Sequence, residues 1–301
     1  MTKSEYAWRA AGPADLAGLA ALDDACFRAD GPELVGWGAY QEQFSAGNAS
    51  IACALTPAGD LVGVAWARMG QSPVMLGGKI HPDHRRQGLG SQAIRWAEDC
   101  ARAQGQPGPV IIRNEAITEG AEALYRHEGY STDFVEYWMN RDLAGPLPDL
   151  PADIRLEIWS DRNALIFYDT FTESFRDRGG PRESAIKWIS WNKDEADFRP
   201  DLCLLAYLGD QPAAFVTAGP LQPAQYDTPI GWIAQMGVRP QWRGRGIADG
   251  LIGEIGRRFR QEGFETLGLD VNLNNPRAMR VYERNGFSVV GKRAKFSKLL
   301  E

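Results

Sequence analysis

The stretch VRPQWRGRGIADG, residues 238–250, places three arginines and three glycines within thirteen residues. It follows the apolar run IGWIAQMGV, residues 230–238. It precedes a segment in which apolar residues recur at helical spacing, namely Ile247, Leu251, Ile255 and Phe259. A strand, a glycine-rich turn and a helix in this order form an anion site, because the first N–H groups of a helix are unpaired and partly positive. The stretch is therefore either a solvated turn or a cradle for phosphate.

The absence of two known phosphate-binding patterns limits the class of compound that this stretch can bind. The dinucleotide fingerprint GxGxxG does not occur, and neither does the nucleoside-triphosphate pattern GxxxxGK[ST]. If residues 238–250 bind phosphate, they bind it in a compound of another class.

The stretch is one half of an internal repeat. IHPDHRRQGLG, residues 80–90, matches VRPQWRGRGIA, residues 238–248, at an offset of 158 residues. LYRHEGY, residues 124–130, matches VYERNGF, residues 281–287, at an offset of 157 residues. Two motifs that repeat at nearly one offset indicate two copies of one fold, each of about 150 residues, a usual domain size.

The repeat defines domain boundaries. RDLAGPLPDLPAD, residues 141–153, carries three prolines and little apolar periodicity. We therefore expect an N-terminal domain over residues 1–143, a proline-rich linker over 144–153 and a C-terminal domain over 154–301. Strand and helix patterns alternate in both halves, and VVGKRAKF, residues 289–296, is expected to close the sheet of the second half. The fold class is α+β, with a mixed, mostly antiparallel sheet flanked by helices in each domain.

Composition excludes several classes of function. The formal net charge is -6, which disfavours nucleic acid and anionic membranes as partners, although Arg-rich clusters occur at residues 85–87 and 243–245. The four cysteines form no CxxC pair, and together with three histidines they show no metal-ligand spacing, so we expect reduced thiols and no metal. No run of eighteen apolar residues and no signal-peptide core occur, so the sequence favours a cytoplasmic protein.

The repeated motifs resemble those of the GNAT acetyltransferase superfamily. Its acyl-CoA loop, [QR]xxGx[GA] after a strand, is matched by Arg243, Gly246 and Ala248 in the second half and by Arg85, Gly88 and Gly90 in the first. Its later NxxAxxxYxxxGF segment is matched by Asn275, Ala278, Tyr282 and Gly286. The first half keeps Ala121, Tyr125 and Gly129, but has Thr118 where asparagine is expected. The resemblance covers essentially the whole chain.

The resemblance implies acetyl-CoA as co-substrate, with its pyrophosphate on the loop and its pantetheine arm along the preceding, splayed strand. In the second half it assigns cofactor binding to Met236, Gly237, Val238, Arg243, Gly244, Arg245, Gly246, Ile247, Ala248, Asn275 and Ala278. In the first half it assigns cofactor binding to Ile80, Arg85, Arg86, Gln87, Gly88, Leu89, Gly90 and Ser91. Tyr282 is the expected general acid for the CoA thiolate, and Tyr125 is its counterpart in the first half.

The general base of the reaction does not follow from the motifs. Many superfamily members carry a glutamate on the strand before the loop, whereas here that strand has Ala234 and Gln235. Asp270, Glu173 and Glu183 are candidates on charge alone. Because the second half fits the motifs better, we expect the chemistry there. The first half then either binds CoA without transferring, or completes the cleft for the acceptor.

A tandem pair of such domains resembles the mycothiol synthase type, which acetylates the cysteinyl amine of a thiol–sugar conjugate. Three functions stay open: acetyl transfer to the primary amine of a small molecule, which we favour, a mycothiol synthase-like activity, and non-catalytic acyl-CoA binding. Acetylation of protein amines is a further alternative. A tandem pair can satisfy its own interface, which is compatible with a monomer.

Overall fold

The computed structural model describes residues 6–33, 47, 49–68, 73–103, 108–178, 183–194, 198–223 and 226–300. These residues form two compact units. Unit 1 consists of residues 1–137, 223–226 and 290–301, and unit 2 of residues 138–222 and 227–289. The fold class is α+β, as expected, with a mixed sheet flanked by helices. Among the described residues, no helix is long and apolar enough to cross a membrane.

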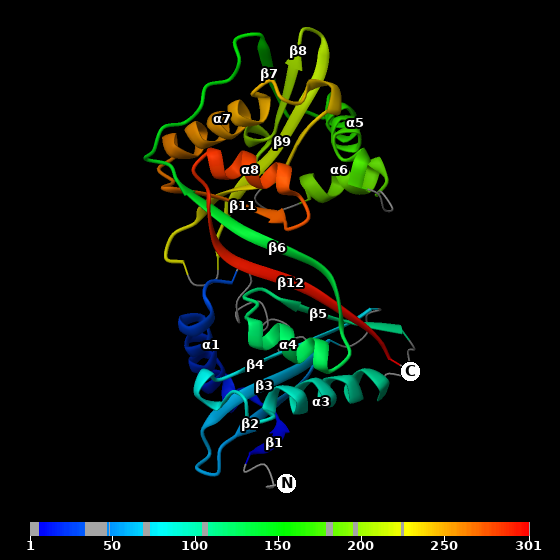
Figure 1. The fold of residues 1–301 in the computed structure, drawn as a ribbon, viewed down its shortest axis with the longest axis vertical. Coiled ribbons are helices and arrows are strands. Elements are labelled where there is room, and N and C mark those ends of the chain that lie inside the picture. The colour runs from blue at the N-terminus through cyan, green and yellow to red at the C-terminus, as the bar shows by residue number, and fades with distance from the viewer. Residues whose placement is uncertain are drawn as a thin grey trace. The chain divides into compact units, whose positions relative to one another are not determined.

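Unit 1 contains most elements of the first half of the chain (Figure 1). The strands are β1 (Ala7–Ala10), β2 (Ala49–Leu55), β3 (Leu61–Arg68), β4 (Val74–Ile80), β5 (Gly108–Asn114) and the first part of β6 (Ser131–Asp142). The helices are α1 (Leu16–Asp30), α3 (Leu89–Ala103) and α4 (Glu119–His127), with 3-10 turns η1 (Pro13–Asp15) and η2 (Pro82–His84). The pairs are antiparallel from β1 to β4, whereas β4 and β5 are parallel.

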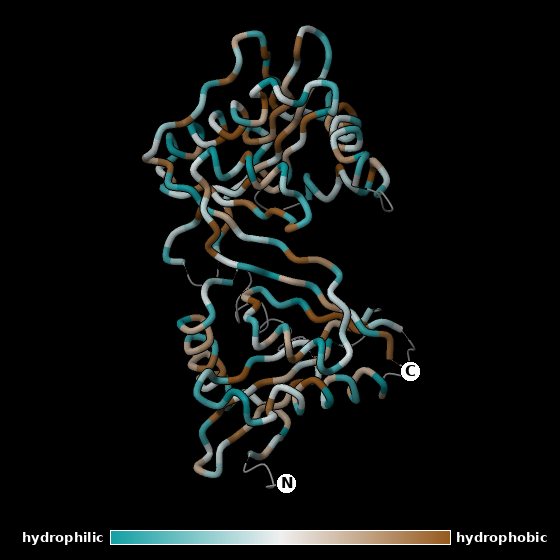
Figure 2. The backbone as a smooth tube through the Cα atoms, in the orientation of Figure 1, coloured by the Kyte–Doolittle hydropathy of each residue, from teal (hydrophilic) through white to brown (hydrophobic). Residues whose placement is uncertain are grey.

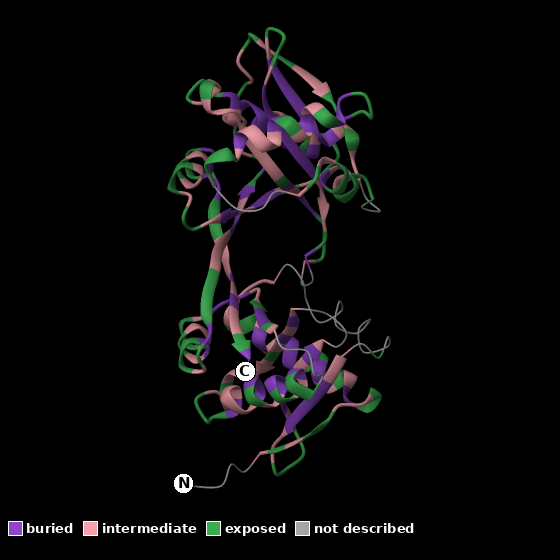
Figure 3. Ribbon diagram, turned by 90° about the vertical axis from the view of Figure 1, so that its right-hand side faces the viewer, coloured by how far each residue is buried: buried purple, intermediate pink, exposed green. Residues whose placement is uncertain are grey.

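The core of unit 1 follows the alternation of side chains along its strands. Ile51 and Cys53 of β2 pack with α1, whereas Ala54 packs with Leu89 at the start of α3. Because successive strand residues point to opposite faces, α1 and α3 cover opposite faces of the sheet. Figure 2 shows hydrophobic residues gathered along the strands, and Figure 3 shows that buried residues follow the same segments.

Unit 2 repeats this order. The strands are β7 (Ile154–Ile158), β8 (Leu204–Leu208), β9 (Gln211–Leu221), β10 (Ile230–Val238) and β11 (Thr266–Asn272), next to which lies the second part of β6. The helices are α5 (Ala164–Ser174), α6 (Ala185–Lys193), α7 (Ile247–Gln261) and α8 (Pro276–Arg284), with 3-10 turns η3 (Arg176–Arg178), η4 (Pro200–Leu202) and η5 (Pro240–Trp242). The apolar stripe predicted on α7 is buried, with Ile247, Leu251, Ile255 and Phe259 at most 2% exposed.

The last strand of the chain does not close the sheet that the sequence suggested. Strand β12 (Ser288–Leu300) pairs antiparallel with β5 of unit 1, with Ala294 opposite Asn114 and Leu300 opposite Gly108. The prediction that residues 289–296 close the second half is therefore wrong. Any strand of the same alternation makes the same backbone ladder, so its pattern does not say which half receives it. The compact units differ from the sequence-based boundaries for this reason.

Residues 144–153 contain neither helix nor strand, and they pack closely on α7. A Cβ atom on Gly253 would lie 1.9 Å from the carbonyl oxygen of Pro148. A Cβ atom on Gly250 would lie 2.7 Å from the Cα atom of Leu150. Glycine is required at these positions of α7 because backbone occupies the space that a side chain would fill.

Candidate active site

Each unit contains a parallel strand pair that opens toward its carboxyl end. In unit 1 the pairing of β4 with β5 ends at Leu76 and Ile112, although β4 continues to Ile80. In unit 2 the pairing of β10 with β11 ends at Ile233 and Leu269, although β10 continues to Val238. Within the described residues, the last residues of β4 and β10 thus extend beyond their parallel ladder. The resemblance implied such a splayed strand for the second half.

The two loops share one backbone course. Gly88 and Gly246 have φ angles of 85° and 74°, and they occupy the same place in the repeat. Two residues earlier, Arg86 and Gly244 have φ angles of 63° and 80°. Arginine in this left-handed region costs about 1–2 kcal/mol, whereas glycine adopts it freely. Unit 1 thus holds a strained arginine where unit 2 has a glycine, and strain of this kind gathers at functional sites.

The first arginine of each loop points into its own unit. Arg85 donates from Nε to the oxygen of Ile80 at 3.1 Å and from both Nη atoms to Asp30 at 2.7 Å. Asp30 raises the pKa of Arg85, outweighing the effect of burial. Arg243 donates from Nε to the oxygen of Val238 at 3.1 Å and from Nη2 to the oxygen of Ser174 at 2.8 Å. The Arg85 guanidinium thus ties the end of β4 to the end of α1, and the Arg243 guanidinium ties the end of β10 to the end of α5. Their role as phosphate ligands stays a prediction.

A cavity of about 580 Å³ lies in unit 1 and passes the open end of β4 and β5. Its wall includes these predicted residues: Ile80, Arg85, Arg86, Gly88, Leu89, Gly90, Ser91 and Tyr125. Gln87 is not part of this wall, and its Oε1 accepts a hydrogen bond from the Tyr6 hydroxyl at 2.8 Å. The structure thus gathers the loop, the splayed strand and the tyrosine of the first half around one space.

Tyr125 is held by hydrogen bonding and packing. It is 8% exposed, and its hydroxyl oxygen accepts a hydrogen bond from Nδ2 of Asn114 at 3.0 Å. Its ring lies 4.8 Å from that of Phe296. Burial raises the pKa of Tyr125, so the group keeps its proton at neutral pH. Because the Asn114 contact uses the oxygen as acceptor, the hydroxyl hydrogen stays available for donation.

Thr118 caps a helix in unit 1 as Asn275 does in unit 2. The Thr118 hydroxyl accepts a hydrogen bond from the backbone N–H of Ala121 at 3.2 Å, at the start of α4. Oδ1 of Asn275 accepts from the N–H of Ala278 at 3.2 Å, at the start of α8. Both residues are N-caps of the helix that carries the tyrosine. The departure from the motif at Thr118 leaves this capping bond in place.

Carboxylates that sequence reasoning missed border the cavity. The carboxylate of Glu33 forms an ion pair with Nζ of Lys79 at 2.7 Å, and Lys79 also contacts Asp23 of α1. Burial raises the pKa of Glu33, and it outweighs the opposite effect of Lys79. Glu115 also lines the cavity, and its buried Oε2 lies 3.7 Å from Nη1 of Arg293. Glu33 follows α1 and Lys79 lies on β4, so only folding brings them together.

The bases considered on charge alone lie elsewhere. Glu173 forms an ion pair with Arg176 at 3.4 Å, and Glu183 forms one with Lys187 at 2.7 Å. Both carboxylates are more than 40% exposed. Asp270 lies on β11 and is partly buried. None of the three borders the cavity of unit 1 or the cavity described next.

A second cavity of about 330 Å³ lies in unit 2, between α6 and the strands β9 and β10. Trp191 and Trp232 form part of its wall, and Gln235 accepts a hydrogen bond from Nε1 of Trp188 at 3.1 Å. The hydroxyl of Thr217 is buried at this wall and has no hydrogen-bond partner among the described residues. Strand β10 is irregular at Ala234, next to Gln235.

The predicted residues of the second half lie on β10, on the loop after it, and on α7 and α8. Met236, Gly237 and Val238 end β10, residues 243–246 form the loop, and Ile247 and Ala248 begin α7. Tyr282 of α8 is 8% exposed, and its ring lies 5.8 Å from that of Phe287. Within the described part of the chain, these residues border neither of the two cavities.

In the part of the chain that the structure describes, no group of three or more histidine, cysteine, aspartate or glutamate side chains could hold a metal ion. Cys26, Cys53, Cys100 and Cys203 are free thiols.

The two loops and the two tyrosine helices fall within segments that match a known family. The model of the acetyltransferase (GNAT) family matches residues 16–130 and again residues 164–287. The chain belongs to the GNAT family. It is a tandem member with one copy of the domain in each half, and it is an acetyl-CoA-dependent acyltransferase.

Three similar proteins each cover nearly the whole chain. A mycothiol acetyltransferase of Parafrankia sp. is 28% identical over 93% of this chain and 93% of its own length. A GCN5-related N-acetyltransferase from Sphaerobacter thermophilus has a TM-score of 0.75 and 24% identity, covering 99% of this chain and 97% of that one. A tandem GNAT protein from the clavulanic acid biosynthesis pathway has a TM-score of 0.63 and 14% identity, covering 98% of both chains. These structural likenesses support the fold, and the sequence likeness places the chain near the mycothiol synthase type.

Proposed function

We propose that this protein transfers the acetyl group of acetyl-CoA to the primary amine of a small molecule, and that the transfer takes place in the cavity of unit 1. The observation that supports this site is the cavity itself, which joins the loop, the open strand pair and Tyr125. The motif fit of the sequence favoured the second half instead, and the role of that half stays a prediction.

The wall of the cavity suits the parts of acetyl-CoA. The backbone N–H groups of Gly88, Leu89 and Gly90 lead into α3, where the partial positive charge of a helix start favours a pyrophosphate. The open edge of β4 at Gly77 and Gly78 can pair with the pantetheine amides. Glycine is needed at Gly77, because a Cβ atom there would lie 2.2 Å from the ring of Trp66.

The transfer proceeds by direct attack in a ternary complex. A neutral acceptor amine attacks the thioester carbonyl, so that a C–N bond forms and the C–S bond breaks. Tyr125 donates its hydroxyl proton to the CoA thiolate as it leaves, and the tyrosine regains a proton from solvent. The attacking nitrogen loses one proton to solvent as the amide forms. Backbone N–H groups of β4 near Gly78 stabilise the oxyanion of the tetrahedral intermediate.

Glu33 takes the proton that the acceptor ammonium must lose before it attacks. Its carboxylate borders the cavity, and the opposed effects of burial and Lys79 leave its pKa above the usual value. A raised pKa makes a carboxylate a better proton acceptor near neutral pH. Glu115, on the same wall, adds negative charge that attracts a cationic amine.

A second candidate acceptor is the amine of a thiol–sugar conjugate. It is supported by the likeness to mycothiol acetyltransferases, of which the Parafrankia protein matches along nearly the whole chain. Non-catalytic acyl-CoA binding is the third candidate, and it predicts binding at the same cavity without turnover.

The test is calorimetric titration of acetyl-CoA into the wild type and into two matched variants, Gly88→Glu and Gly246→Glu. Both glycines are left-handed, and a Cβ atom at either would meet its nearest neighbour no closer than 3.8 Å, so the two changes strain the loops alike. We expect Gly88→Glu to lose the unit 1 site, because a carboxylate then faces the pyrophosphate, and Gly246→Glu to retain it. Retention of full binding by Gly88→Glu would contradict the proposal.

A further inference from the structure

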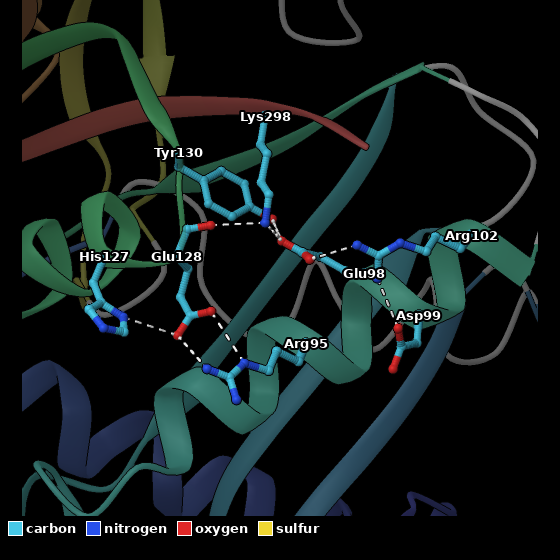
Figure 4. A network of polar contacts seen from close by, with 8 residues as sticks. All are labelled: Arg95, Glu98, Asp99, Arg102, His127, Glu128, Tyr130 and Lys298. Atoms are coloured by element: carbon cyan, nitrogen blue, oxygen red, sulfur yellow. Dashed lines mark hydrogen bonds and ion pairs between the residues drawn. The ribbon is translucent and has the colours of Figure 1, made fainter. Parts of the chain in front are cut away.

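The last strand of the chain contacts the helix that carries Tyr125, and Figure 4 shows one of its residues, Lys298, beside Glu98 and Glu128. Phe296 of β12 is fully buried, and its ring lies 4.8 Å from the ring of Tyr125. Two residues further, Nζ of Lys298 donates to the carbonyl oxygen of Glu128 at 2.9 Å. Glu128 is the C-cap of α4, so a residue near the end of the chain holds the end of a helix in the first half.

Lys298 is itself held by a buried acid. Nζ of Lys298 lies 2.8 Å from Oε1 of Glu98 on α3, and Glu98 is only 4% exposed. The hydroxyl of Tyr130 donates to the same Oε1 at 3.0 Å, and Arg102 lies 3.3 Å from Oε2. A buried carboxylate holds its cations firmly, because loss of either Lys298 or Arg102 would leave part of its charge without compensation. The geometry of Lys298 is therefore well defined.

The contact with Glu128 completes the support of α4. Thr118 caps the start of the helix, and Lys298 binds a carbonyl at its end, where a cation also interacts favourably with the helix dipole. The chain then returns beneath the helix, since the N–H of Tyr130 donates to the carbonyl oxygen of Tyr125 at 2.9 Å. A helix of nine residues is short, and contacts at both ends set the place of its side chains.

We propose that Lys298 is a positioning residue for Tyr125, through which the last strand of the chain sets the catalytic geometry of the first half. The inference rests on the proposed function of Tyr125 as general acid. Proton transfer requires the hydroxyl to lie within hydrogen-bond reach of the leaving sulfur, so a small displacement of α4 slows the chemical step. The side-chain hydrogen bonds of Lys298 within the described residues go to Glu98 and Glu128, which belong to neither the loop nor β4. A change at Lys298 should therefore spare cofactor binding.

The chain offers a matched control on the same strand. Lys295 lies on the opposite face of β12, where its Nζ forms an ion pair with Asp133 at 3.1 Å. The side chains of Lys295 and Lys298 are both 25% exposed. Lys295→Met therefore removes one ion pair from β12 without changing the support of α4.

The experiment compares the wild type, Lys298→Met, Lys298→Arg, Lys295→Met and Tyr125→Phe. The rate of acetyl transfer to an amine acceptor and the Kd of acetyl-CoA are measured for each protein. Hydrogen exchange is followed for the amides of residues 119–129, which cover α4. We expect Lys298→Met to lower kcat about tenfold or more and to speed exchange in α4, while the Kd changes less than threefold. Lys298→Arg should recover most of the rate, because a guanidinium can still pair with Glu98.

The outcomes separate the inference from the proposed function. The inference is overturned if Lys298→Met leaves hydrogen exchange in α4 unchanged. It is also overturned if Lys298→Met lowers kcat no more than Lys295→Met does. Faster exchange with an unchanged kcat overturns it as well, because the support then has no catalytic effect. If Tyr125→Phe retains the wild-type kcat, the proposed function of Tyr125 fails, and with it the catalytic consequence drawn for Lys298.

Discussion

The loops after β4 and β10 have the same backbone course, whereas the strands before them carry different side chains. In unit 1 the strand presents Lys79, which joins Asp23 and Glu33 in a charged cluster beside the cavity. At the same place of the repeat, unit 2 has Gly237, and a Cβ atom there would lie 2.6 Å from Cβ of Ser174. The two units thus share the backbone conformation of the loop, whereas the charged groups beside it differ between the halves.

A second difference between the halves is the residue at the start of the helix that carries the tyrosine. Asn275 matched the family pattern and Thr118 did not, which led the sequence argument to favour the second half. In the structure both residues cap their helix with the same bond at 3.2 Å. The match to the family pattern at this position therefore shows sequence similarity only. It does not show which of the two helices is capped, because threonine and asparagine form the same capping bond.

Replacement of Glu33, the proposed base, should have the largest effect on activity among the changes that distinguish the two halves. We expect Glu33→Gln to lower kcat/KM about 100-fold, because an amide does not accept the proton of the acceptor ammonium. Glu173→Gln, which replaces an exposed carboxylate of the second half, should change kcat/KM less than twofold. Equal rates for Glu33→Gln and the wild type would remove Glu33 from the mechanism.

The pH dependence of the same variant sharpens the assignment. Burial raises the pKa of Glu33 above its usual value of 4.5, so kcat/KM should rise with pH through this higher pKa as the carboxylate becomes free to accept a proton. The folded state also binds this proton more tightly than the unfolded chain does. Its contribution to stability is complete below the unfolded pKa and is lost as the pH rises through the folded pKa. Glu33→Gln should abolish both trends, which pH–rate profiles and pH-dependent urea unfolding measure.

The two helix caps should respond alike. Thr118→Ala and Asn275→Ala should each lower the free energy of unfolding by about 1 kcal/mol, because an orphan N–H at the start of α4 or α8 loses its acceptor. Thr118→Asn should leave stability within about 0.5 kcal/mol of the wild type. Urea unfolding of the three variants measures this, and a loss confined to Asn275→Ala would show that the caps are not equivalent.

The smallest effect is expected from exchanging the loop residues between the halves. Arg86→Gly relieves left-handed backbone strain of about 1–2 kcal/mol but gives the unfolded chain more freedom, for a net gain of about 0.5 kcal/mol. Gly244→Arg should destabilise by a comparable amount for the opposite reasons. Destabilisation by Arg86→Gly would mean that contacts of the side chain outweigh the strain.

Local patterns of the sequence predicted much of the fold. The repeat indicated two copies of one domain, and the helical spacing of Ile247, Leu251, Ile255 and Phe259 predicted the buried stripe of α7. The strand, loop and helix order also predicted both loops. These features depend on residues that are close in the chain, so their physical causes are visible in a short window.

Features that depend on distant residues were not predictable. The pairing of β12 with β5 joins residues nearly 200 positions apart, and the alternation of β12 fits either sheet. Glu33 and Lys79 meet across 46 positions, and each alone reads as a surface charge. The inward turn of Arg85 toward Asp30 was missed for the same reason, although an arginine in a glycine-rich loop suggested a phosphate ligand.

The central claim is that acetyl transfer takes place in the first half of the chain. It is tested most directly by the steady-state kinetics of Tyr125→Phe and Tyr282→Phe, which remove one hydroxyl from equivalent places of the repeat. We predict that Tyr125→Phe lowers kcat about 10²–10⁴-fold, as the loss of a general acid does, and that Tyr282→Phe lowers it less than twofold. The opposite result, with kcat lost only in Tyr282→Phe, would contradict the account and place the chemistry in the second half.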